Sequence, residues 1–225
     1  MPVYLLDEEI RFPDPALANK EGLLAIGGDL SPERLIEAYS KGIFPWYSEE
    51  SPILWWSPDP RPVLFPDNLK VSKSLRQVLN SNKFTITFDR HFEQVMINCA
   101  VIERPDHGGT WITDEMIGAY TKLHKMGFAH SVETYRKDKL VGGLYGVSIG
   151  KVFFGESMFH KMSDASKVAL YHLIEKLKEL DFKIIDVQQK TSHLTSLGAS
   201  MISREDFLTI MKENTSGKLP SFNWQ

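Results

Sequence analysis

Two adjacent segments, Leu140–Ser148 and Val152–Phe159, restrict the possible folds of this chain more than any other feature. Both have the composition of β-strands, and only a short turn at Ile149–Lys151 separates them, which predicts an antiparallel hairpin. The first segment contains three glycines, Gly142, Gly143 and Gly146. Residues without a side chain leave room for something to lie against the backbone, so we expect a close contact on this strand.

The second segment is rich in aromatic residues but holds one carboxylate, Glu156, directly after Gly155. An ionised carboxylate is costly to bury unless it is paired. Glu156 is therefore expected either to face a cleft or substrate, or to form an ion pair with a lysine or arginine. Strict alternation places it on the face opposite Phe153, so the strand must bulge at Gly155 if both residues line one site.

Further strands are predicted on either side of this hairpin. Ala129–Arg136 lies before the hairpin and is connected to it by a short turn, so three consecutive antiparallel strands are expected. Phe84–Phe88 alternates like a strand, and Ile184–Gln189 is another. Within the last segment, a period of two puts Asp186 and Gln188 on one face. This polar pair is a candidate for catalysis, although a solvated edge, or an aspartate bonded to nearby backbone, gives the same pattern.

Helices are predicted from cap residues and from apolar side chains at helical spacing. Pro32–Ser40 has Ser31 as its N-cap and Gly42 just past its end. The other helices are expected near residues 72–80, after Asp89, after Thr113, after Ser163 or Asp164, and after the capping box formed by Ser203 and Asp206.

Residues 1–66 are rich in proline and tryptophan, and their prolines prevent long regular elements. We expect a small irregular N-terminal domain over residues 1–66 and a larger α/β domain with a mostly antiparallel sheet over residues 67–225. The fold class is then α+β. A loop is expected over residues 104–111, between two predicted helices.

Composition excludes several classes of protein. The single cysteine, Cys99, rules out an internal disulfide and a cysteine zinc site, which favours a reducing compartment. No apolar run reaches membrane-spanning length, and the first residues are acidic where a signal peptide is basic. We therefore expect a soluble, cytoplasmic protein that does not contact a membrane, and we take it to be a monomer.

Known cofactor motifs are missing from the sequence. It has no G-x-x-x-x-G-K-[ST] and no G-x-G-x-x-G that opens a helix. Its histidines show no metal-binding spacing with carboxylates or with Cys99. No metal and no other cofactor are expected.

Two surface features could contact a nucleic acid. Trp46 and Trp111 lie in predicted loops, where a tryptophan can stack on a base. Residues 67–91 carry an excess of bases that includes Lys73, Arg76 and Lys83. Such an excess could meet phosphates, and a solvated helix face gives the same pattern.

Several stretches together resemble the bacterial leucyl/phenylalanyl-tRNA–protein transferase family. They are GLLAIGGDLSPERLIEAYSKGIFPW, ILWWSPDPR, GGTWITDEMIGAY, GGLYGVSIGKVFFGESMF, and IIDVQ with the later HLTSLGA. The resemblance implies an aminoacyltransferase that moves Leu or Phe, and less well Met, from aminoacyl-tRNA to the N-terminal Arg or Lys of acceptor proteins, marking them for N-end-rule degradation. It also implies a GNAT-like (acetyltransferase) fold for the larger domain.

The resemblance also implies roles for particular residues. Glu156, Asp186 and Gln188 would be the catalytic and acceptor-side residues. The amino-acid pocket would be lined by Phe153, Leu170 and Ile185. The terminal adenosine of the tRNA would be held by Trp46 and Trp111. The phosphates of the acceptor stem would meet Lys73, Arg76 and Lys83.

A neutral amide is a poor base, so Gln188 is interpreted as a residue that positions the amine, with Asp186 as its orienter and charge partner. The alternative is that Gln188, polarised by Asp186, accepts the proton. Glu156 would pair with the cationic group of the acceptor. Two other functions fit the sequence: an acyl-CoA-dependent N-acyltransferase on the same sheet, and a non-catalytic tRNA-binding module.

Overall fold

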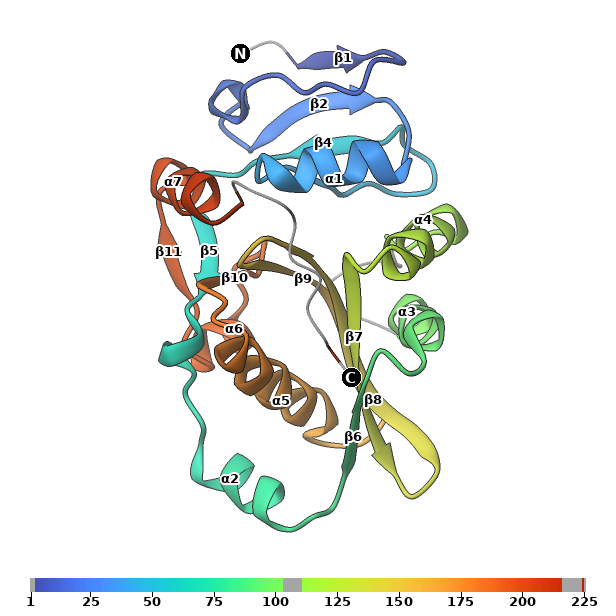
Figure 1. The fold of residues 1–225 in the computed structure, drawn as a ribbon, viewed down its shortest axis with the longest axis vertical. Helices are drawn as coiled ribbons and strands as arrows, with labels where there is room; N and C mark the ends of the chain where they lie inside the picture. Colours follow the sequence, from blue (N-terminus) through green and yellow to red (C-terminus); the bar gives the residue numbers. More distant parts are fainter. Residues whose placement is uncertain (1–2, 103–110, 216–223, 225) are drawn as a thin grey trace.

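The computed structural model describes residues 3–102, 111–215 and 224. Within them the strands form a four-stranded and a seven-stranded sheet, and Figure 1 shows the smaller sheet at one end of the molecule. The predicted α+β class with a mostly antiparallel sheet is confirmed. Most of the loop predicted over 104–111 lies outside the described residues.

The four-stranded sheet is built from the part of the chain that is rich in proline and tryptophan. Its order is β1 (Tyr4–Leu6), β2 (Leu23–Gly27), β4 (Leu54–Trp56) and β3 (Phe44–Pro45). A short helix, η1 (Pro15–Leu17), precedes β2, and α1 (Pro32–Ser40) follows it. The α1 helix begins as predicted, because the Ser31 side chain accepts a hydrogen bond from the backbone N–H of Arg34. The region predicted to be irregular therefore contains a sheet of short strands.

The seven-stranded sheet has the order β11-β5-β10-β9-β8-β7-β6. Its strands are β5 (Arg61–Leu64), β6 (Thr85–Phe88), β7 (Ala129–Arg136), β8 (Lys139–Ile149), β9 (Val152–His160), β10 (Ile184–Asp186) and β11 (Ser200–Ile202). The predicted run of three antiparallel strands, β7 to β9, is confirmed, and the β9–β10 pair is parallel. Because β5 precedes residue 66, the larger sheet takes in a strand from the predicted N-terminal region; the boundary itself stays a prediction.

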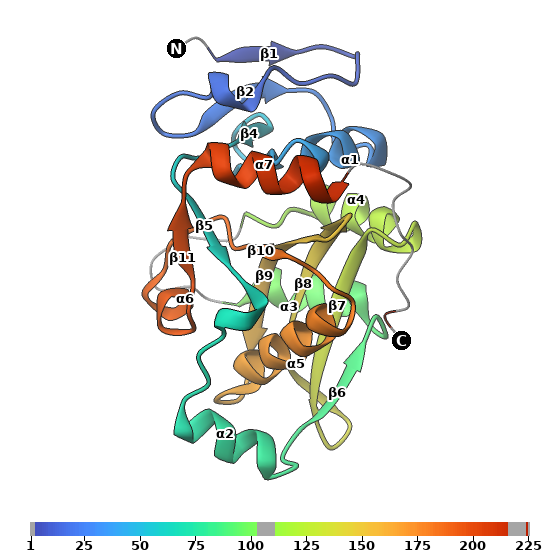
Figure 2. The same cartoon turned by 60° about the vertical axis from the view of Figure 1, so that its left-hand side comes forward.

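The remaining helices are η2 (Pro66–Asn68), α2 (Lys73–Asn80), α3 (Phe92–Val101), α4 (Asp114–Lys125), α5 (Ala165–Glu179), α6 (Ser192–Ser196) and α7 (Arg204–Thr215). Figures 1 and 2 show α3 and α4 on one face of the larger sheet and α5 on the other. The predicted caps at Thr113 and Ser203 are confirmed by hydrogen bonds from the first turns of α4 and α7. Ser72 caps α2 in the same way.

Three local predictions are corrected by the structure. Asp89 does not cap α3; it accepts hydrogen bonds from His130 and from the backbone of Ser131 instead. Asp164 stands at the start of α5 with φ of 68° and makes no capping hydrogen bond. The last predicted strand ends at Asp186, because Gln188 has φ of 57°, outside the extended region.

The glycines of β8 make room for the protein's own chain. A Cβ atom on Gly142 would lie 2.5 Å from the Ala165 side chain, and one on Gly146 would lie 2.5 Å from the Phe153 ring. Both distances are below van der Waals contact. The close contact expected on this strand is therefore made by the start of α5 and by the neighbouring strand β9.

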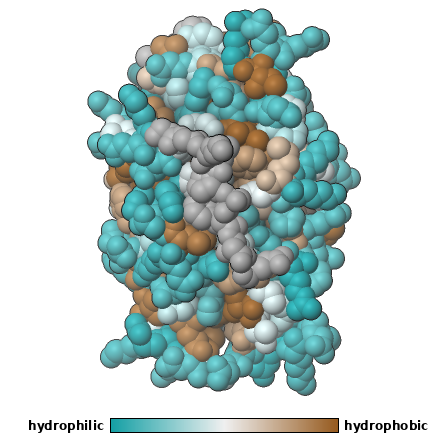
Figure 3. Space-filling view, viewed as in Figure 1, coloured by the Kyte–Doolittle hydropathy of each residue, from teal (hydrophilic) through white to brown (hydrophobic). Residues whose placement is uncertain are grey.

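The surface is mainly hydrophilic on the face shown in Figure 3, with hydrophobic side chains in separate patches. In the part of the chain that the structure describes, no helix is both long enough and apolar enough to cross a membrane. Among the described residues, none form a cluster of three or more histidine, cysteine or acidic side chains that could hold a metal ion.

Candidate active site

A cavity of about 430 Å³ lies where β8, β9, β10 and α5 meet. Its floor is apolar and includes the three residues predicted for the amino-acid pocket, Phe153, Leu170 and Ile185. Phe153 on β9 is the register partner of Ile185 on β10, and α5 brings Leu170 over them. All three side chains are at least 95% buried. The structure therefore brings these residues together as predicted.

The predicted bulge at Gly155 is confirmed. Gly146 on β8 pairs with Gly155, but the preceding residue, Tyr145, pairs with Ser157. This shift leaves Glu156 without a partner across the ladder and turns it toward the same cavity as Phe153. A carboxylate and an aromatic ring that strict alternation would separate therefore line one site.

Glu156 is held by a chain of hydroxyl and amide groups. Its Oε1 accepts a hydrogen bond of 2.8 Å from the Tyr39 hydroxyl and another of 2.8 Å from Nε2 of Gln188. The Tyr120 hydroxyl in turn bonds to that of Tyr39. Burial raises the pKa of Glu156 to about 7, although the hydrogen bonds from Tyr39 and Gln188 act to lower it. Among the described residues, no lysine or arginine forms an ion pair with Glu156.

Asp186 forms a fully buried ion pair with Arg61. The Nε and Nη2 atoms of Arg61 donate to the two carboxylate oxygens over 2.9 and 2.6 Å. The guanidinium also lies over the rings of Phe44 and Phe207, at 4.8 and 4.6 Å from their centroids. Bidentate contact with a stacked guanidinium fixes the position of the Asp186 carboxylate and places a counter-charge beside it.

Gln188 joins these two groups. Its backbone N–H donates to Oδ1 of Asp186 over 3.0 Å, while its side chain donates to Glu156. The φ of 57° allows both bonds, because it turns the chain sharply just after β10. Since Nε2 donates to Glu156, the amide oxygen of Gln188 is left as an acceptor. The predicted catalytic residues Glu156, Asp186 and Gln188 therefore form one connected network.

Trp46 and Trp111, the two predicted stacking residues, both line the cavity. Trp46 packs edge-on against Trp56, whose indole N–H donates to the Trp46 carbonyl oxygen. Trp55, in contrast, is fully buried in the smaller sheet. The structure therefore separates the tryptophans of the cavity from the tryptophan of the core.

The predicted phosphate-binding residues are not part of this cavity. Lys73 and Arg76 lie exposed on α2, and Lys83 follows that helix with its ammonium 4.9 Å from the centre of the Phe84 ring. Figures 1 and 2 show α2 at the end of the molecule opposite the four-stranded sheet. The basic residues thus belong to a separate surface.

Comparison with known proteins identifies the family. The family model for leucyl/phenylalanyl-tRNA protein transferase matches residues 63–212, and the model for the N-terminal domain of that family matches residues 28–59. The chain belongs to the leucyl/phenylalanyl-tRNA–protein transferase family. It is therefore an enzyme of the aminoacyltransferase class, which favours the first of the three functions considered from the sequence.

Relatives with this name cover nearly the whole chain. The leucyl/phenylalanyl-tRNA–protein transferase of Syntrophobacter fumaroxidans is 55% identical over 100% of this chain and 96% of its own. That of Hydrogenovibrio crunogenus is 57% identical over 95% of this chain and 84% of its own. Among solved structures, an aminoglycoside acetyltransferase from an uncultured soil metagenomic sample has a TM-score of 0.39 and 14% identity, over 64% of this chain and 97% of its own.

Sequence reasoning missed three residues at the polar end of this transferase site. Tyr39 and Tyr120 fit the apolar faces of their helices. Nothing local indicates that the Tyr39 hydroxyl bonds to Glu156 or that the Tyr120 hydroxyl bonds to Tyr39. Arg61 lies 125 residues from Asp186, so only the pairing of β5 with β10 brings the two together. One usable signal was the position of Arg61 beside Pro60 and Pro62, in a segment otherwise apolar up to Phe65.

Proposed function

We propose that this transferase moves Leu or Phe, and less well Met, from aminoacyl-tRNA to the N-terminal Arg or Lys of acceptor proteins, and so marks them for N-end-rule degradation. The observation that carries the proposal is a single cavity with an apolar floor and a polar end. An esterified apolar side chain fills the floor, and an incoming amine meets the polar end. The enzyme would act as a monomer in the cytoplasm.

The floor favours apolar side chains, such as those of Leu, Phe and Met, which are unbranched at Cβ. Phe153, Leu170 and Ile185 offer no hydrogen-bonding side chain, so a polar amino acid would lose its hydration without compensation. One methylene group changes binding in an apolar pocket by only about 1–3 kcal/mol. Discrimination among Leu, Phe and Met should therefore be graded.

The polar end supplies the groups that aminolysis of an ester requires. An α-amine has an ordinary pKa of about 7.7–8.0, so it must lose a proton before it attacks. Glu156, whose pKa is raised to about 7 by burial, is well matched to receive that proton. The amide oxygen of Gln188 accepts a hydrogen bond from the same nitrogen and aligns it. The new C–N bond forms as the ester C–O bond breaks, and the ribose hydroxyl leaves with a proton.

Asp186 acts by positioning in this mechanism. Arg61 already balances its charge, and its Oδ1 is occupied by the backbone N–H of Gln188. We therefore assign it the task of holding Gln188 in its turned conformation. This keeps Asp186 as the orienter and Gln188 as the residue that positions the amine, as expected from the sequence. Glu156, which was expected to pair with the cationic group of the acceptor, takes the proton that the alternative assigned to Gln188.

The tRNA would contact two separate surfaces. Its terminal adenosine would stack on Trp46 and Trp111 at the cavity, which contributes roughly 1–3 kcal/mol for each base–aromatic contact. The phosphates of its acceptor stem would meet Lys73, Arg76 and Lys83 near α2. The activated ester supplies the driving force, so no cofactor and no metal are required.

A transfer assay tests the proposal. Purified enzyme is mixed with Phe-tRNA labelled on the amino acid and with a peptide that begins with Arg, and labelled peptide is measured. The same peptide with an acetylated N-terminus is the control, because it has no free α-amine. Binding of Phe-tRNA without transfer would refute the enzyme function, and protection against thermal unfolding by acetyl-CoA would instead support an acyl-CoA-dependent enzyme.

A further inference from the structure

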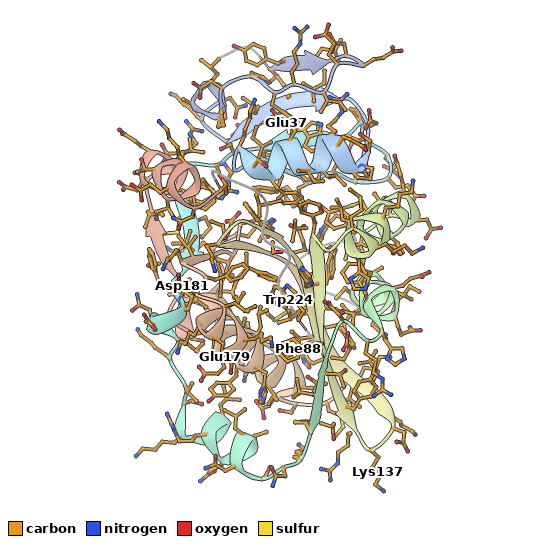
Figure 4. The ribbon with its side chains drawn as sticks, viewed as in Figure 1. Glu37, Phe88, Lys137, Glu179, Asp181 and Trp224 are labelled. Atoms are coloured by element: carbon orange, nitrogen blue, oxygen red, sulfur yellow. The ribbon has the colours of Figure 1, made fainter. Side chains whose placement is uncertain are left out.

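Trp224 lies in the core on the α5 face of the larger sheet, against the floor of the cavity (Figure 4). Its side chain is 3% exposed. The indole stacks on His130 with 4.0 Å between ring centroids and lies 5.8 Å from Phe153 and 6.0 Å from Phe182. It does not line the cavity itself. Trp224 is therefore behind a residue that does.

The surface on which Trp224 packs is rigid. His130 bonds through Nδ1 to Asp89 over 2.7 Å and through Nε2 to the carbonyl oxygen of Gly127 over 3.1 Å. With both ring nitrogens engaged, the imidazole is held in one orientation on β7. A tryptophan stacked on such a ring is held in place as well.

Phe153 is confined between this tryptophan and the backbone of β8. A Cβ atom on Gly146 would lie 2.5 Å from Cε1 of Phe153, so the ring rests directly on that strand. Trp224 packs against the same ring. Because the ring is held by both neighbours, the position of this part of the cavity floor is fixed.

We propose that Trp224 sets the depth of the amino-acid pocket by holding Phe153 in place, and so determines how larger and smaller apolar side chains compete. The inference rests on the proposed function, because it takes the floor of the cavity to be the amino-acid pocket. Trp224 is a positioning residue in this scheme. Its indole reaches the Phe153 ring from outside the cavity.

The direction of the effect follows from packing. Shortening Trp224 to alanine leaves a void behind Phe153, and the ring can move back into it. The pocket then becomes deeper and gains room for a longer side chain. A phenylalanine at this position should have a smaller effect on folding, because among the described residues the indole N–H has no hydrogen-bond partner that would be lost.

The test compares Trp224→Ala and Trp224→Phe with wild type. Transfer of Leu, Phe and naphthylalanine, each esterified to tRNA, is measured as kcat/KM. We expect use of naphthylalanine relative to Leu to rise about tenfold in Trp224→Ala and by less in Trp224→Phe. An equal loss for all three substrates would show a merely structural role and overturn the proposal.

Leu177→Ala is the matched control. Leu177 is fully buried in the same apolar cluster but does not line the cavity. The Leu177→Ala variant should lose stability without a change in the ratio of naphthylalanine to Leu transfer. A change in this ratio equal to that in Trp224→Ala would also overturn the proposal. If Trp224→Ala does not fold, the substrate ratio of Trp224→Phe tests the proposal instead. Absence of transfer by the wild type would refute the proposed function, whereas wild-type transfer with unchanged ratios in the variants refutes only the role of Trp224.

Discussion

The two ends of the cavity are built in different ways. The floor consists of apolar residues that lie on β9, β10 and α5, whereas the polar end joins side chains from distant parts of the chain. Tyr39 and Glu156 are 117 residues apart, and Arg61 and Asp186 are 125 residues apart. The floor would tolerate small changes, but each polar group depends on a specific partner.

The energetic cost of a substitution also differs between the floor and the polar end. Burying an apolar side chain stabilises the fold by about 1.5–3 kcal/mol, and a slightly smaller side chain loses only part of this. A buried charge without its partner is strongly destabilising. Substitutions at the polar end should therefore have large effects, and substitutions in the floor should have graded ones.

The largest effect is expected for Arg61→Met. It leaves the carboxylate of Asp186 buried without a counter-charge, so the free energy of unfolding should fall by about 3–5 kcal/mol. Urea denaturation measures the loss. The double variant Arg61→Met/Asp186→Leu should recover most of the stability but not the transfer rate, because the backbone N–H of Gln188 has then lost its acceptor on Asp186. A double variant as unstable as the single one would contradict this interpretation.

Glu156 should make stability depend on pH. Its pKa is about 7 in the folded protein and 4.5 as an ordinary glutamate, so folding takes up a proton between these values. The contribution of this group to stability therefore falls as pH rises from 4.5 to 7. Glu156→Gln removes the titration, and its advantage over wild type should grow from near zero at pH 4 to at most about 3 kcal/mol at pH 8. Thermal unfolding across this range is the measurement, and a constant difference would contradict the shifted pKa.

Gln188→Ala should act on the rate of transfer. Loss of the amide oxygen that aligns the amine should lower kcat about 100-fold, with little change in KM for Phe-tRNA. Steady-state transfer to an Arg peptide separates the two constants. Gln94→Ala, on the exposed side of α3, is a control that should leave both unchanged. A rise in KM without a fall in kcat would show that Gln188 contributes to binding of the substrate and not to alignment of the amine.

The smallest effect is expected in the floor. Ile185→Val removes one methyl group from the cavity and should change the ratio of Leu to Phe transfer by roughly fivefold. The neighbouring Ile184→Val removes the same group from a fully buried side chain in the other core cluster, which is away from the cavity. Competition between Leu-tRNA and Phe-tRNA measures both variants. Equal shifts in the two would show that the floor does not select the side chain.

Local patterns predicted much of the fold and part of the site. The three antiparallel strands, α1 with its cap, and the bulge at Gly155 follow from turn residues, cap residues and the period of the apolar positions. The strand at Ile184 was predicted too long, because the left-handed conformation of Gln188 has no local signal in a glutamine. The cap expected at Asp89 failed because a distant strand competes for that carboxylate.

The sequence by itself determined which residues are apolar at strand and helix spacing, and therefore which faces turn toward the core; the floor residues were named by the family resemblance. Periodicity is a local property, so it can be read along the chain. Only the tertiary structure decided that Arg61 neutralises Asp186, that Tyr39 and Gln188 share Glu156, and that Trp224 packs behind Phe153. Each of these contacts depends on the geometry of two distant elements, and no pattern along the chain encodes the distance between them.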